Sequence, residues 1–585
     1  MHSRSNHTAT AAAVGTLTTA LAGLVMLPVL ASAEDAGGRA AVPDAPAVVV
    51  RLAAASELEE SLVYLARLAG AEEPDRLRDR LIAAATAGRG LAGIDRLRPA
   101  GGYGFIGPHG DDGAVVLIVP VADERAFVDL LEGGLHLALQ AGGDGVYTAG
   151  AVELPGLKAE PVYVRIESGW AFVTVRDRGA LARGRLLPPE AVLAGARCAG
   201  GGEPRSGDVA SAAPVGDGPN AVRGCEHPAT GLVSVTVNVD RIPRTFKEVV
   251  LGQLDAGLAQ AKRDAPAFGT EGLWPFLAGI VDEIAASMAT QLFEGAETSL
   301  RIDLDRRLGV VTLTVRIAAR PGTAMAAAIA AFGQSTSVTA GLLRPGAAVA
   351  GALNVVMLRR ERELLSGLVD GVRRSALAAS GGELERIAVG TAFDTLRPTL
   401  EAGEIDLAFD LLGPGSDGLY SFIGAVKVRN GATLQRVFRL APPRSPVTDA
   451  RFVGTVAGSG VHRLTVDLDE PFRRVFGGNT AYLGFRDDAV FVAAGPRALG
   501  LVRETLPLGP VTAPRIGELR IAADRLMPLS GDPALQDLAR SVLGSAKGGG
   551  AIRLKVEGGA TLTLKLSMPA KLIEFASALG RGIMR

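Results

Sequence analysis

The chain has 585 residues, of which 48% are hydrophobic and 21% are charged, and its formal net charge is −1. A chain of this length exceeds what one hydrophobic core supports, so several domains are expected, and its composition excludes a wholly disordered protein. The near-neutral charge provides no global field that would attract nucleic acid.

The first residues have the three parts of an export signal. Residues 1–10 contain an arginine and no acidic residue, and residues 11–30 are mostly apolar and free of charge. Ala31 and Ala33 then frame a signal-peptidase site. We predict a signal peptide over residues 1–33 and export to the periplasm or the extracellular space; its retention as an uncleaved anchor is the alternative. After the signal, we expect no transmembrane span.

A first α+β module is predicted over residues 34–189. An alternating strand at 48–52 leads into Ser56–Glu59, which has the pattern of a helix-capping box. Gly102–Gly107 fits the G-x-G-x-x-G pattern of dinucleotide-binding loops, but a turn and a strand follow where that site needs a helix. The pattern therefore predicts a β-hairpin, as do the strands of 163–175.

Both cysteines of the chain, Cys198 and Cys225, fall in a Gly/Ala/Pro-rich insertion over residues 190–230. In an oxidising compartment an even number of cysteines favours a disulfide, which would tether this insertion more than brace a core. Free thiols remain open, as does a metal site that includes His227, although the spacing matches no standard zinc pattern.

The rest of the chain repeats a hairpin that leads into a helix. Four further α+β modules are predicted, over residues 231–338, 339–446, 447–510 and 511–585. In the hairpin of 300–317, apolar residues alternate with Asp, Thr and Arg, and an Ala-rich helix follows it. Alternation with period two buries one face of a sheet. The fold class expected is α+β: tandem modules of antiparallel sheet whose apolar face lies under the helix that follows each hairpin.

Two short motifs carry a resemblance to known sequences. With stretches such as Gly93–Pro99 and Pro161–Val164, the chain resembles uncharacterised exported proteins of planctomycete-type bacteria with tandem strand-hairpin-helix units. The resemblance implies export and repeated α+β units, and it implies no activity, ligand or catalytic residue.

The remaining polar and aromatic candidates favour structural roles. The chain shows no P-loop, nucleophile elbow, zinc-protease motif or EF-hand loop. We expect no metal set or catalytic triad from the histidines His109, His136, His227 and His462. The acidic pairs are expected on solvated strand faces: Asp303/Asp305, Glu404/Asp406, Asp467/Asp469 and Asp487/Asp488. Trp170 and Trp274 are expected to be packing anchors.

The sequence thus favours an exported, non-enzymatic binding or envelope-associated structural protein, with no cofactor and no nucleic-acid partner. Two alternatives stay open. One is an exported hydrolase whose site is assembled from dispersed residues. The other is a carrier of lipid or other apolar ligands in a groove between sheet and helices.

Overall fold

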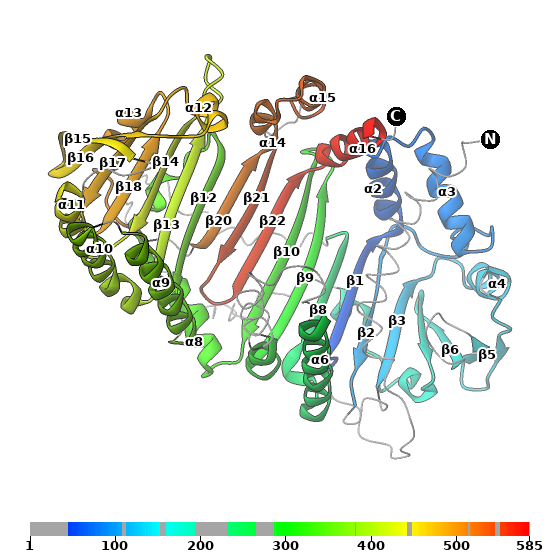
Figure 1. The fold of residues 1–585 in the computed structure, drawn as a ribbon. Coiled ribbons are helices and arrows are strands. Elements are labelled where there is room, and N and C mark those ends of the chain that lie inside the picture. The colour runs from blue at the N-terminus through cyan, green and yellow to red at the C-terminus, as the bar shows by residue number, and fades with distance from the viewer. Residues whose placement is uncertain are drawn as a thin grey trace, which may run out of the picture. The chain divides into compact units, whose positions relative to one another are not determined.

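The structure is a computed structural model (Figure 1). It describes residues 45–107, 113–134, 136–152, 160–193, 231–264, 286, 288–357, 359–380, 382–440, 447–512, 515–544 and 550–583. The predicted signal peptide, both cysteines, His109, His227 and Trp274 lie outside these residues.

The chain forms two compact units. Unit 1 comprises Met1–Val63, Glu73–Phe293 and Glu297–Asp303, and unit 2 comprises Tyr64–Glu72, Glu294–Ala296 and Leu304–Arg585. Each unit contains antiparallel strands and helices.

The sheet of unit 1 is antiparallel, with the order β4-β5-β6-β7-β3-β2-β1-β8-β9. The bounds are β1 Val48–Ala54, β2 Pro99–Phe105, β3 Ala114–Pro120, β4 Gln140–Ala141, β5 Val146–Val152, β6 Glu160–Glu167, β7 Trp170–Val175, β8 Val233–Asn238 and β9 Gly295–Asp305. The G-x-G-x-x-G pattern begins within β2, which pairs antiparallel with β3, so the predicted hairpin is confirmed.

Helices cover part of both faces of this sheet. They are α2 Ala55–Leu68, which continues into unit 2, α3 Pro74–Ala85, α4 Glu124–Gly134, η1 Arg178–Leu181, α5 Pro189–Leu193, η2 Val239–Arg241 and α6 Arg244–Asp264. On one face, α4 packs Phe127, Leu130 and Leu131 against β6 and β7. On the other face, η1 and α5 close a core that contains Tyr103, Phe172 and Trp170. Trp170 is buried, and the Arg98 guanidinium lies 3.8 Å from its ring centroid, which supports its role as a packing anchor.

The sheet of unit 2 is also antiparallel, with the order β10-β22-β21-β20-β12-β13-β14-β18-β17-β16-β15. The bounds are β10 Val310–Ala319, β12 Ala347–Val356, β13 Glu404–Leu412, β14 Ser421–Lys427, β15 Val447–Val456, β16 Ser459–Val466, β17 Thr480–Arg486, β18 Ala489–Ala494, β20 Arg515–Ala522, β21 Ala551–Glu557 and β22 Leu562–Pro569. The short strands β11 Thr336–Ser337 and β19 Val511–Thr512 form a separate pair.

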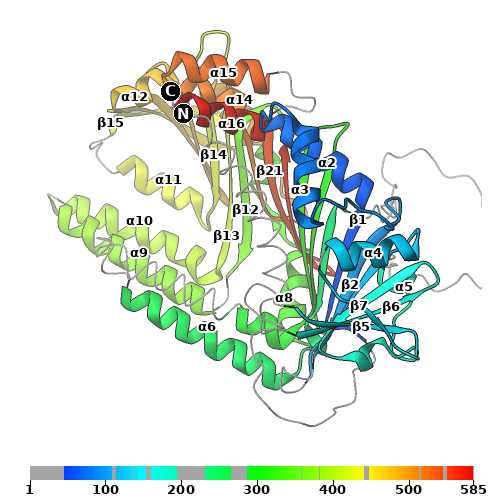
Figure 2. The same cartoon turned by 90° about the vertical axis from the view of Figure 1, so that its right-hand side faces the viewer.

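The helices of unit 2 lie around this sheet (Figure 2). They are α8 Ala324–Phe332, η4 Ala340–Leu342, α9 Arg359–Ala379, α10 Glu383–Ala402, α11 Gly431–Leu440, α12 Glu470–Phe476, α13 Ala498–Thr505, α14 Ala523–Leu526, η5 Met527–Ser530, α15 Pro533–Leu543 and α16 Lys571–Ile583. The main core lies where α13 and η4 cover one face of β13, β14 and β18, around Leu342, Ile423, Phe491 and Leu501.

The α+β class is confirmed, but coverage of each hairpin by its own following helix is not. Helix α8 also contacts a hairpin other than its own. Its residue Ile329 accepts a hydrogen bond from the backbone N–H of Gly559, in the turn between β21 and β22, at 2.9 Å. Strands from different predicted modules also pair, as β10 does with β22 and β12 with β20. The predicted modules therefore share one sheet in unit 2.

A candidate apolar binding face

One face of the unit 2 sheet is apolar from β10 to β17. Residues that are directly opposite on antiparallel strands point to the same side, so the register fixes which side chains share a face. One row across the sheet is Leu313, Leu566, Leu554, Leu519, Gly351, Phe409, Gly424, Val492 and Leu483. The next is Val315, Leu564, Val556, Gly517, Leu353, Leu407, Val426, Val490 and Phe485. These two rows, here called the apolar face, contain no side chain that forms a hydrogen bond.

Glycines let aromatic rings lie close to the backbone on this face. A Cβ built on Gly351 would meet the ring of Phe409 at 2.5 Å, and one built on Gly424 would meet the ring of Phe422 at 3.0 Å. The two rings are stacked, with centroids 6.5 Å apart and an interplanar angle of 26°. The aromatic side chains therefore lie low over the sheet.

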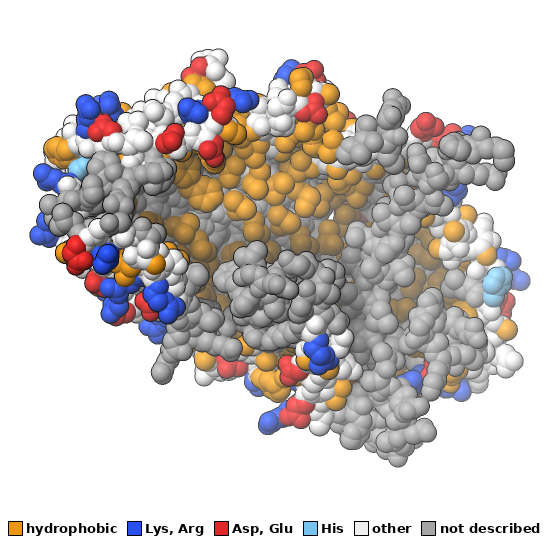
Figure 3. All heavy atoms as spheres, viewed as in Figure 1, with side chains coloured by type: hydrophobic (Ala, Val, Ile, Leu, Met, Phe, Trp, Pro, Cys, Tyr) orange, Lys and Arg blue, Asp and Glu red, His pale blue; other side chains and the backbone are white. Residues whose placement is uncertain are grey.

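Much of the apolar face is accessible. Leu353, Val426 and Val492 are 36%, 44% and 37% exposed. Figure 3 shows hydrophobic side chains gathered in a hollow over β12, β20, β21 and β22. A contiguous apolar surface of this kind marks a site for a membrane, a ligand or a partner, because water contact with it is unfavourable.

The helical hairpin of α9 and α10 stands away from the sheet, as Figure 2 shows by the separation of both helices from β12 and β13. Arg373 of α9 and Asp394 of α10 hold the pair together through an ion pair of 3.1 Å. The hairpin exposes apolar side chains of its own, with Val372 53% and Ile387 57% exposed.

An aromatic cluster around the buried His462 borders the apolar face beyond β17. His462 on β16 pairs with Leu483, so its side chain lies on the same side of the sheet, where α11 covers it. The rings of Phe438, Phe452 and Phe485 surround it at centroid distances of 5.3, 5.4 and 5.8 Å. Its Nε2 atom hydrogen-bonds Gln435, and burial lowers its pKa. His462 is thus a buried core histidine.

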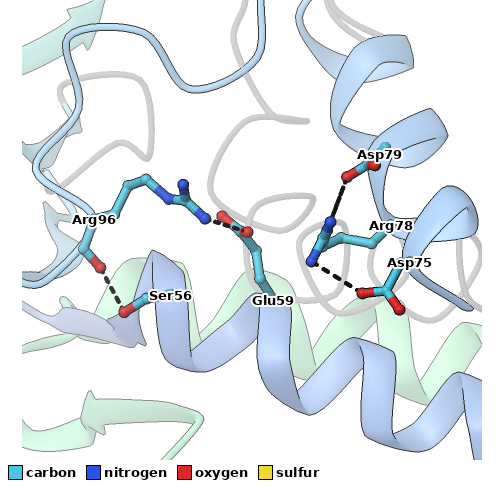
Figure 4. Close-up of polar contacts among 6 residues, drawn as sticks. All are labelled: Ser56, Glu59, Asp75, Arg78, Asp79 and Arg96. Atoms are coloured by element: carbon cyan, nitrogen blue, oxygen red, sulfur yellow. Dashed lines mark hydrogen bonds and ion pairs between the residues drawn. The ribbon is translucent and has the colours of Figure 1, made fainter.

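A polar cluster in unit 1 is the most conspicuous group of charged side chains there (Figure 4). The Arg96 guanidinium binds the Glu59 carboxylate at 2.5 Å, and the Ser56 hydroxyl donates to the Arg96 carbonyl at 2.9 Å. Glu59 and Ser56 therefore bind Arg96 rather than the helix end, and the expected capping box is wrong. Arg78 pairs separately with Asp75 and Asp79. The cluster ties α2 to the loop before β2 and presents no activated nucleophile.

The acidic pairs follow the expectation of solvated faces with one exception. Asp467 and Asp469 are exposed, but Asp406 is only 1% exposed. Asp406 accepts hydrogen bonds from the hydroxyls of Ser337 at 2.7 Å and Thr339 at 2.5 Å. It lies inward because it anchors the loop before η4, a contact between segments far apart in sequence.

No protein-family model, curated protein or solved structure matches this chain. The resemblance to exported planctomycete-type proteins thus stays a prediction. In the described part of the chain, no group of three or more His, Cys, Asp or Glu side chains is placed to hold a metal ion. Nor does any described helix combine the length and apolar character needed to cross a bilayer.

The sequence analysis did not identify the apolar face as one surface: it recognised most of the strands that form it but not β12. The alternation of each strand shows which residues share its own face. Which strands lie side by side, and whether a helix covers them, depends on contacts between distant segments.

Proposed function

We propose that this protein is an extracytoplasmic carrier that binds long-chain acyl lipids along the apolar face of unit 2. The accessible hydrophobic face that runs from β10 to β17 is the observation that carries this proposal.

The chemistry of the face favours acyl chains over a polar ligand. The strands of this face from β22 to β17 each lie between two others, so their backbone N–H and C=O groups are already paired with both neighbours. The side chains add no hydrogen-bonding group. A polar ligand would lose its hydrogen bonds to water there and gain none, whereas an acyl chain has none to lose.

A protein partner fits this face less well. Protein surfaces that form interfaces remain substantially polar. Their polar groups would be buried against Leu, Val and Phe side chains without partners, which costs free energy. An acyl chain gains about 0.8 kcal/mol for each methylene that it buries.

The test is displacement of a fluorescent fatty acid. The purified chain should bind cis-parinaric acid and release it on addition of palmitate. The double variant Val426→Asp/Val492→Asp places two charges on the apolar face and should weaken binding by at least about tenfold. Leu97→Asp is the matched control, because Leu97 is 82% exposed and lies in the other unit, so binding should be unchanged.

Two results would overturn the proposal. One is the absence of saturable fatty-acid binding by the folded protein. The other is a dimer in sedimentation experiments that the double variant, but not the Leu97→Asp control, converts to monomer. That result would show that a second copy of the chain covers the face.

The export part of the proposal rests on the signal-like sequence of residues 1–33. N-terminal sequencing of protein recovered from the periplasm or the medium should begin at Glu34. Protein that retains Met1 and sediments with membranes would indicate an anchor instead.

A further inference from the structure

A second cluster lies on the opposite face of the unit 2 sheet. Asp410 on β13 and Arg520 on β20 flank Ala350 on β12, since both pair directly with it. The backbone N–H of Arg344, in the loop before β12, donates to Asp410 Oδ2 at 2.9 Å. Ala350 itself has only a methyl side chain and is 4% exposed.

Three polar atoms of this cluster are buried without a hydrogen-bond partner: Asp410 Oδ1, Arg344 Nη1 and Arg520 Nε. Asp410 itself is 0% exposed. Buried polar atoms in folded proteins are nearly always paired, and leaving one unpaired costs about 1–3 kcal/mol. The charges of Arg344 and Arg520 act on Asp410, so these unpaired atoms belong to side chains that interact electrostatically, and a bound polar group could pair with them.

Exposed arginines also lie on the solvent side of the cluster. Arg525 and Arg553 lie close enough to Arg520 to repel its charge, and both are exposed. Two further carboxylates act on these arginines: Glu504 accepts a hydrogen bond from Arg344 Nη2 at 3.1 Å, and Glu518 attracts Arg520. The exposed arginines provide a route by which an anion can enter from solvent.

We infer that Arg344, Arg520 and Asp410 bind hydrogen phosphate. Its oxygens accept hydrogen bonds from Arg344 Nη1 and Arg520 Nε, and its own O–H donates to Asp410 Oδ1. An ion without a proton, such as sulfate, would place an oxygen against the carboxylate and be repelled. The site is independent of the apolar face, which lies on the other side of the sheet.

The test is isothermal titration calorimetry at pH 8 with inorganic phosphate, sulfate and glycerol 3-phosphate. Phosphate should bind at least about tenfold more tightly than the other two, because at this pH neither sulfate nor the phosphoryl group of glycerol 3-phosphate carries a proton to donate to Asp410. Arg520→Gln should weaken phosphate binding by about tenfold or more. Asp410→Asn should reduce the preference for phosphate over sulfate, because an amide no longer repels an unprotonated oxyanion.

Arg540→Gln is the control, since Arg540 is an exposed residue of α15 paired with Asp537, and it should leave binding unchanged. Circular dichroism melts establish that each variant is folded, and Arg520→Lys replaces Arg520→Gln if the latter does not fold. Equal binding of phosphate and sulfate would overturn the inference. So would the absence of phosphate binding, which would mean that water alone fills the cluster.

Discussion

The ring of Phe409 lies against the backbone of Gly351, so closely that a Cβ on Gly351 would meet Phe409 Cε1 at 2.5 Å. The two residues are directly paired on β13 and β12. Absence of a side chain on one strand therefore lets the aromatic ring on the other lie over the sheet.

Gly351→Ala should displace that ring and destabilise unit 2 by about 1 kcal/mol, since an added methyl in a close contact forces neighbouring side chains to move. Gly517→Ala is the control, because the nearest atom to its added Cβ is 3.7 Å away. Urea denaturation measures both. An equal loss of unfolding free energy in the two variants would show that the contact with Phe409 is unimportant.

The two faces of β10 should respond differently to a carboxylate. Leu313 lies on the apolar face, whereas Thr314 lies on the opposite face, directly paired with Lys565. Leu313→Asp should cost about 1–3 kcal/mol of unfolding free energy, because it places a charge among partly buried leucines. Thr314→Asp should change the free energy of unfolding by less than about 0.5 kcal/mol, because attraction to Lys565 offsets the lower strand propensity of aspartate. Similar costs in chemical denaturation would contradict the assignment of the faces.

The ion pair shown in Figure 4 should contribute more than an ordinary surface pair. The Glu59 side chain is only 11% exposed, and its Oε1 atom is buried without a hydrogen bond. Arg96→Ala should cost about 1–3 kcal/mol, because it removes the partner of a mostly buried carboxylate. Arg76→Ala breaks an exposed pair with Glu73 and should cost at most about 0.5 kcal/mol. Thermal melts compare the two variants. Equal shifts in melting temperature would show that Glu59 does not need Arg96 as its partner.

Burial raises the pKa of Asp410 from 3.8 to about 7. Between these values the folded state holds a proton that the unfolded state has lost, so the free energy of unfolding falls as the pH rises. The slope from this group is at most about 1.4 kcal/mol per pH unit. Asp410→Asn should remove this contribution and raise stability at pH 8 relative to the natural chain. Denaturation curves at pH 4, 6 and 8 measure it, and unchanged pH dependence in the variant would show that Asp410 titrates normally.

Local structure was largely predictable from sequence, because the signals that specify it lie within a few residues. Alternation predicted a strand at 48–52, and β1 spans Val48–Ala54. An Ala-rich helix was predicted after the hairpin of 300–317, and the Thr323 hydroxyl accepts from the Ala326 N–H at 3.2 Å at the beginning of α8. Side-chain periodicity and helix capping act over one or two turns and do not depend on the rest of the fold.

Tertiary structure alone decided what lies beside and above each strand. Thr312 and Ser567 face each other across β10 and β22 although they are 255 residues apart in the chain. Nothing local in Asp410 distinguishes it from the exposed Asp467, yet pairing with β12 places Asp410 inside the protein. The order of the strands is set by the burial of many side chains at once. For this reason the sequence determined that each strand has an apolar side, but only the assembled sheet decided that these sides form one accessible face.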